Sequence, residues 1–158
     1  MAASPDLTAA LTPEALTALR AAYSAPFMLE ASRRAVAFPH PASAPYVESV
    51  IKGFYDAARM APRDRERVLV ALLASQSNAP SLLLAVHLYW GLMEGLSVAD
   101  LADTLGLSGV YTGLGHYTAG LKTLRVTLDA LVDLTSKPDA KLDAAAVVGA
   151  LSASPKLS

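Results

Sequence analysis

Residues 97–124, SVADLADTLGLSGVYTGLGHYTAGLKTL, carry the pattern that decides the fold class. Ser97, followed three residues later by Asp100, is typical of a helix start at which side chains cap the backbone N–H groups. Gly113-Leu114-Gly115 then interrupts the apolar spacing of three and four residues, and a long helix is expected from about His116 to Leu134. The stretch therefore predicts two helices joined at a glycine break.

The rest of the chain has the same helical spacing, and no segment alternates apolar and polar residues as a strand does. The run Val68–Ala74 is apolar on all sides, so its helix is expected to be central and buried. Further helices are expected at about 13–23, 27–38, from Pro45 to the stop at Pro62, at 63–76, at 80–94, and in a short Ala-rich segment after Pro138. The prediction is an all-α fold, one compact bundle of about seven helices over residues 1–158, with a disordered tail at about 152–158.

Composition excludes several classes of function. The chain has 13 basic and 14 acidic residues, too balanced for the positive field that nucleic-acid binding requires. It has no cysteine, which excludes thiol chemistry and disulfides, and its three scattered histidines predict no metal site. The N-terminus lacks a signal-peptide pattern and the apolar runs are too short to span a membrane, so we expect a cytoplasmic protein without a membrane partner. A hydrophobic content of 53% favours a homo-oligomer.

Three segments together resemble the carboxymuconolactone decarboxylase family, whose fold is that of the alkylhydroperoxidase D proteins. They are RDRERVLVALLAS (63–75), HLYWGLMEGLSVADLADTL (87–105) and GVYTGLGHYTAGLKTL (109–124), within a family-like core of about 63–134. The resemblance implies a trimer, a hexamer or a related homo-oligomer. The peroxidase-like members carry Cys-x-x-Cys shortly before the family histidine, where this chain has Pro80 and Leu83. The chain is therefore more similar to the branch without cysteines, and peroxidase activity is the least expected function.

Glu66 and His87 are the central candidate residues. The resemblance implies that their helices lie side by side, so that the carboxylate orients the imidazole and the imidazole moves a proton. The alternative interpretation is structural: Glu66 favours a helix start and His87 is a hydrogen-bonded core residue.

Four further residues are weaker candidates. Tyr111 precedes the glycine break and could donate a hydrogen bond to a substrate oxygen, although core packing is equally compatible with it. His116 could be a second acid/base or an anion contact, or a surface residue. Trp90 shares a helical face with His87 and could form a pocket wall, although packing is the commoner meaning. Arg63 could bind a substrate carboxylate, although a solvated helix start is commoner.

Two functions from different classes follow from these residues. The first is a cofactor-free lyase that acts on a small carboxylated ring or lactone, with His87, Glu66 and Tyr111 as the catalytic candidates. The second is a catalytically silent ligand-binding or structural oligomer. A pocket that reaches His87 and Glu66 would favour the enzyme, whereas a sealed apolar setting for His87 would favour the scaffold.

Overall fold

The computed structural model describes residues 11–23, 49, 60–76 and 81–157, and the regular elements of this part of the chain are α-helices. The all-α prediction is confirmed for these residues. The helices expected at 27–38 and from Pro45 lie outside them, so the number of about seven stays a prediction. The described helices are α1 (Pro13–Ala22), α4 (Pro62–Ala74), α5 (Ser81–Met93), α6 (Val98–Thr112), α7 (Leu114–Thr135) and α8 (Ala144–Ser152).

The helix ends follow the capping chemistry of the sequence. Ser97 Oγ accepts the Asp100 N–H at 3.0 Å, and Asp100 Oδ2 accepts the Ser97 N–H at 2.9 Å, which forms the expected capping box at α6. Gly113 separates α6 from α7 with a φ of 103°, a conformation that a side chain would strain. The glycine break therefore turns the chain sharply between two long helices.

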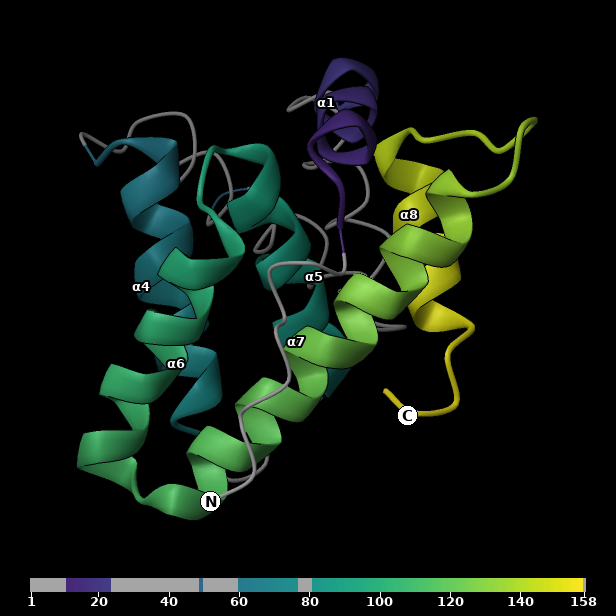
Figure 1. Cartoon of the computed structure of the whole chain (residues 1–158). Helices are drawn as coiled ribbons and strands as arrows, with labels where there is room; N and C mark the ends of the chain where they lie inside the picture. The colour runs from purple at the N-terminus through teal and green to yellow at the C-terminus, as the bar shows by residue number, and fades with distance from the viewer. Residues whose placement is uncertain (1–10, 24–48, 50–59, 77–80, 158) are drawn as a thin grey trace.

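Helix α5 is the centre of the bundle. It contacts each of the other described helices, and its residues from Leu84 to Met93 are all buried (Figure 1). The prediction that the helix containing Val68–Ala74 is central is wrong, because α4 lies at the edge of the bundle and exposes Val68 and Leu72. An apolar run on all sides of a helix is compatible with burial but does not require it. Helices α4 and α5 are both apolar, and it is α5 that lies at the centre of the bundle.

Helices α6 and α7 form a closely packed hairpin that projects at the lower left of Figure 1. A Cβ atom at Gly109 would lie 2.5 Å from Tyr117 Cβ, which is closer than side chains can approach. Gly120 likewise faces Leu105, at 2.9 Å. Glycine at these positions lets the two backbones approach.

The C-terminal residues complete one side of the bundle. Helix α8 packs against α5 and α7. Residues 153–157, for which the sequence predicts disorder, form a turn in which the Leu157 N–H donates to the Ser154 carbonyl at 3.1 Å and Leu157 is buried. None of the described helices combines the length and apolarity needed to cross a membrane.

Candidate functional site

The Glu66 and His87 side chains meet inside the bundle. Helices α4 and α5 pack side by side, and His87 Nδ1 lies 2.8 Å from Glu66 Oε2. The Glu66 carboxyl group is fully buried, and His87 is 7% exposed. A contact between residues 21 positions apart in the sequence is made by the fold, since the two side chains lie on different helices.

The chemistry of this hydrogen bond determines the proton positions on the imidazole. A carboxylate only accepts hydrogen bonds, so with Glu66 ionised His87 Nδ1 must be the donor. In the neutral ring Nε2 then carries the lone pair. The pair therefore has the arrangement in which a carboxylate orients a histidine and the far nitrogen exchanges a proton.

Arg65 is a third member of this cluster. Its Nε lies 3.7 Å from Glu66 Oε1, so it forms an ion pair with the second carboxylate oxygen without a hydrogen bond. Oε1 has no hydrogen-bond partner among the described residues. Coulomb attraction to Arg65 offsets part of the cost of burying the carboxylate. Sequence reasoning missed this pairing, because adjacent helical residues do not normally face each other.

Trp90 packs edge-to-face against His87, with the ring centroids 4.8 Å apart and the planes at 83°. It is 3% exposed, and its Nε1 has no hydrogen-bond partner among the described residues. A buried N–H without a partner lowers stability by about 1–3 kcal/mol. The immediate surroundings of His87 thus include an indole donor as well as a carboxylate.

Tyr111 and Arg63 lie in different surroundings from this pair. Tyr111, near the C-terminal end of α6, is 84% exposed. Arg63 lies at the start of α4 with half its side chain exposed, and its Nη2 is 3.5 Å from Asp100 Oδ2. Hydrogen bonds from the Ser97 N–H and hydroxyl, helped by Arg63 and Arg67, lower the pKa of Asp100. Arg63 therefore helps to join α4 to the start of α6.

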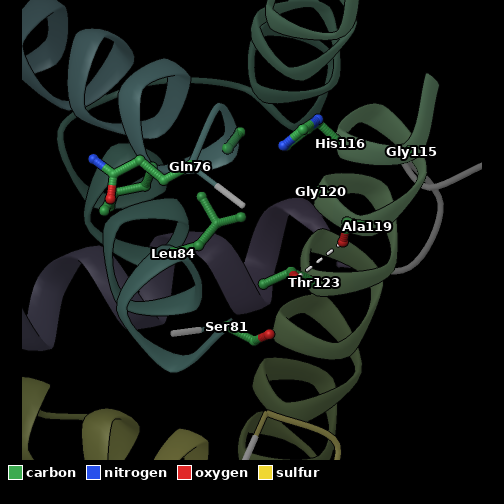
Figure 2. A pocket seen from close by; sticks show the side chains of 10 residues that line it. Gln76, Ser81, Leu84, Gly115, His116, Ala119, Gly120 and Thr123 are labelled. Carbon is green, nitrogen blue, oxygen red and sulfur yellow. Dashed lines mark hydrogen bonds between the residues drawn. The ribbon is translucent and has the colours of Figure 1, made fainter. Parts of the chain in front are cut away.

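His116 lines a pocket of about 350 Å³ between α4, α5 and α7 (Figure 2). The polar residues that line it are Gln76, Ser81, His116 and Thr123. His116 Nδ1 lies 3.0 Å from the Thr112 carbonyl, and Figure 2 shows the ring reaching from α7 toward the α4 side of the pocket. Sequence reasoning missed Gln76, Ser81 and Thr123, because only the fold brings these residues together.

The pocket and the Glu66–His87 pair occupy different levels of the same two helices. Neither Glu66 nor His87 lines the pocket. Leu73, which does, follows Glu66 by two turns of α4, a distance of about 10 Å along the helix axis. Two of the three histidines of the chain therefore occupy separate sites.

The described residues contain no group of three or more His, Asp and Glu side chains placed to hold a metal ion. Comparisons of the chain with protein-family models, with curated proteins and with solved structures found no match. The function is therefore inferred from the geometry of its own residues and from the sequence resemblance.

Proposed function

We propose that the chain is a cytoplasmic, cofactor-free acid/base enzyme, similar to carboxymuconolactone decarboxylase, that removes CO₂ from a small carboxylated ring or lactone. The observation that carries this proposal is the buried 2.8 Å hydrogen bond between His87 Nδ1 and Glu66 Oε2. An oriented imidazole is the commonest general acid/base in enzymes, and fixing Nδ1–H directs Nε2 to the substrate.

In the proposed reaction the bond between the ring carbon and the carboxylate breaks, and its electron pair stays on the substrate as an enolate-like anion. The neutral imidazole first takes a proton from solvent at Nε2. CO₂ leaves, and His87 gives this proton to the ring carbon and returns to the neutral ring. The carboxylate and one proton from solvent thus become CO₂ and the protonated ring compound. Glu66 accepts the Nδ1–H bond throughout and balances the positive charge of the doubly protonated ring.

Trp90 is the proposed wall of the substrate site. Its edge-to-face contact with His87, with the ring centroids 4.8 Å apart, supports this proposal. Its unpartnered N–H would gain a hydrogen bond by donating to the enolate-like oxygen of the substrate, which stabilises the anion. We also propose roles in substrate binding or catalysis for three residues that do not contact the Glu66–His87 pair in this way: Tyr111, His116 and Arg63.

We also propose that the chain forms a homo-oligomer, a trimer or a hexamer. The supporting observation is an apolar stripe of exposed side chains near the break between α6 and α7: Leu107, Val110 and Tyr111, at helical spacing in α6, and Leu114 at the start of α7. Burial of such a stripe against another copy would remove it from water. Tyr111 belongs to this stripe, so its proposed catalytic role would be at the active site of a neighbouring copy.

A second candidate function is a catalytically silent ligand-binding or structural protein. It is favoured by the low exposure of His87 and by the position of the pocket, which the Glu66–His87 pair does not line. In this interpretation the pair is a buried polar contact between α4 and α5.

The two functions are separated by a proton-transfer assay. Purified full-length protein is incubated in D₂O with a panel of small carboxylated lactones and ring acids, and CO₂ release and deuterium incorporation at the ring carbon are followed. The enzyme proposal expects turnover that falls at least 100-fold in His87→Gln, because general acid/base catalysis contributes about 10²–10⁴. His40→Gln, a change of the same kind at a histidine with no proposed role, should keep full activity. Absence of turnover over the whole panel, or equal turnover in His87→Gln, would favour the silent protein.

A further inference from the structure

The Glu66–His87 pair can hold its protons in two arrangements. With Glu66 ionised, His87 Nδ1 donates to the carboxylate, and a further proton goes to Nε2. With Glu66 protonated, the carboxyl O–H donates to Nδ1 instead, and the ring proton is on Nε2. The first arrangement gives Nε2 a lone pair in the neutral ring and a transferable proton in the charged ring. The second leaves a neutral ring whose Nε2–H can donate a hydrogen bond but accepts no proton.

The burial of Glu66 by itself works against the ionised arrangement. Its side chain is fully buried, and removal of a carboxylate from water is costly unless an opposite charge lies nearby. A neutral imidazole at 2.8 Å supplies a hydrogen bond but no charge. The ionised arrangement therefore needs a cation beside the carboxylate.

Arg65 is a cation in this position. Its Nε lies 3.7 Å from Glu66 Oε1, whereas His87 contacts Oε2, so the two residues act on different oxygens of one carboxyl group. The Arg65 side chain is only 13% exposed. Water and salt screen a charge at this depth less than they screen a surface pair. The Arg65 charge therefore acts on Glu66 at close to its full strength.

Two acidic groups on neighbouring elements also bear on this cluster. Burial and the nearby Glu94 raise the pKa of Tyr23, at the end of α1, and the charge of Glu66 contributes to the same shift. The Tyr23 phenol is therefore neutral. Asp100, on α6, forms an ion pair with Arg67 at 3.0 Å. Neither group supplies the positive charge that an ionised Glu66 requires.

We propose that Arg65 is a positioning residue that keeps Glu66 ionised, and so places the exchangeable proton of the pair on His87 Nε2 rather than on the carboxyl group. Arg65 acts through Glu66 and need not contact the substrate. The proton arrangement rests only on the geometry of the three residues. Its consequence for turnover rests on the proposed function, in which a charged imidazole gives its proton to the substrate carbon.

The test is the tautomer of His87 in full-length Arg65 variants, read from the ¹⁵N shifts of its two ring nitrogens at neutral pH. Arg65→Gln and Arg65→Met both remove the charge and keep part of the aliphatic stem, so the test does not depend on the folding of one variant. Both should move the ring proton from Nδ1 toward Nε2, because the carboxyl group takes a proton and donates it in the bond to Nδ1. Arg65→Lys keeps a cation and should keep the natural tautomer.

Arg67→Gln is the matched control. It removes a cation two positions further along α4, where Arg67 pairs with Asp100 and is 42% exposed, and it should leave the His87 tautomer unchanged. The amide spectra of all variants report whether they are folded. The proposal is overturned if the folded neutral variants keep the natural protonation at Nδ1, or if Arg65→Lys or Arg67→Gln changes the tautomer as much as they do.

A turnover assay separates this proposal from the decarboxylase function. On a substrate that the natural protein turns over, Arg65→Gln should lower kcat about 10-fold or more with little change in KM, and Arg65→Lys should keep most of the rate. A changed tautomer in Arg65→Gln together with no turnover in the natural protein would contradict the decarboxylase and support the role of Arg65. Turnover in the natural protein together with an unchanged tautomer and rate in Arg65→Gln would do the reverse.

Discussion

His87 and His116 each form a hydrogen bond through the same ring nitrogen, Nδ1, in two different environments. Each imidazole donates through Nδ1, His87 to a buried carboxylate on another helix and His116 to a backbone carbonyl four residues earlier in the chain. The first bond depends on the packing of α4 against α5, whereas the second needs only the local turn at Gly113. The comparison shows that the same tautomer can be fixed by the fold or by local structure, with different consequences for stability.

The largest expected effect is at the buried pair. Glu66→Ala removes the hydrogen-bond partner of His87 and the ion-pair partner of Arg65, leaves a cavity in the core, and should lower the free energy of unfolding by about 3–5 kcal/mol. His116→Ala breaks a bond to a backbone carbonyl near the surface, and should cost about 0.5–1.5 kcal/mol. Urea unfolding of both variants measures the difference, and equal losses would contradict the distinction between the two histidines.

The double variant Glu66→Leu/His87→Leu sharpens this comparison. Replacement of both members of a buried hydrogen-bonded pair by apolar residues of similar volume is often nearly neutral or stabilising. The double variant should therefore be more stable than Glu66→Ala. Its loss in free energy of unfolding should be much smaller than the sum of the losses in Glu66→Leu and His87→Leu. If it is as unstable as the sum of the two single leucine variants, the pair is not energetically coupled.

A middle-sized effect is expected where α6 meets α7. Gly109→Ala places a Cβ 2.5 Å from Tyr117 and should cost about 1–3 kcal/mol, because α7 must shift. The shift should change the NMR signals of the pocket residues more than those of His87. Gly106→Ala is the control: its Cβ would lie 3.8 Å from Tyr117, an ordinary contact, and alanine favours the helix. Equal stability of the two alanine variants would contradict the close approach of the helices.

The smallest effect concerns acid stability. The pKa of Asp100 is lowered in the folded protein, chiefly by the Ser97 N–H bond, so the ionised carboxyl group contributes stability above its unfolded pKa of about 3.9. This contribution is lost as pH falls through the lower folded pKa. Asp100→Asn should therefore lose less stability than the natural protein between pH 5 and pH 2, as measured by urea unfolding. An unchanged dependence on pH would show that the capping carboxylate contributes nothing.

Local chemistry made much of the fold predictable. The cap at Ser97 and the break at Gly113 are each specified by a few neighbouring residues, and the structure has both. Which apolar helix is central is not a local property, so the sequence favoured α4 where the structure has α5.

Part of the candidate site could likewise be predicted from the sequence, and part could not. The family resemblance proposed that Glu66 and His87 lie close together, and the structure places them in hydrogen-bond contact. The ion pair from Arg65 and the pocket around His116 could not be predicted, because they depend on side-chain directions and on residues far apart in the sequence. Spacing within one helix predicts a shared face, as for Trp90 and His87, but does not say what the face contacts.

The most direct test of the central claim is the tautomer of His87, read from the ¹⁵N shifts of its two ring nitrogens in a long-range ¹H–¹⁵N NMR spectrum at neutral pH. The hydrogen bond to Glu66 predicts a protonated Nδ1 in the natural protein and loss of this preference when Glu66 is replaced by alanine. A neutral ring protonated at Nε2, unchanged in Glu66→Ala, would contradict the proposal that Glu66 holds His87 as a proton carrier.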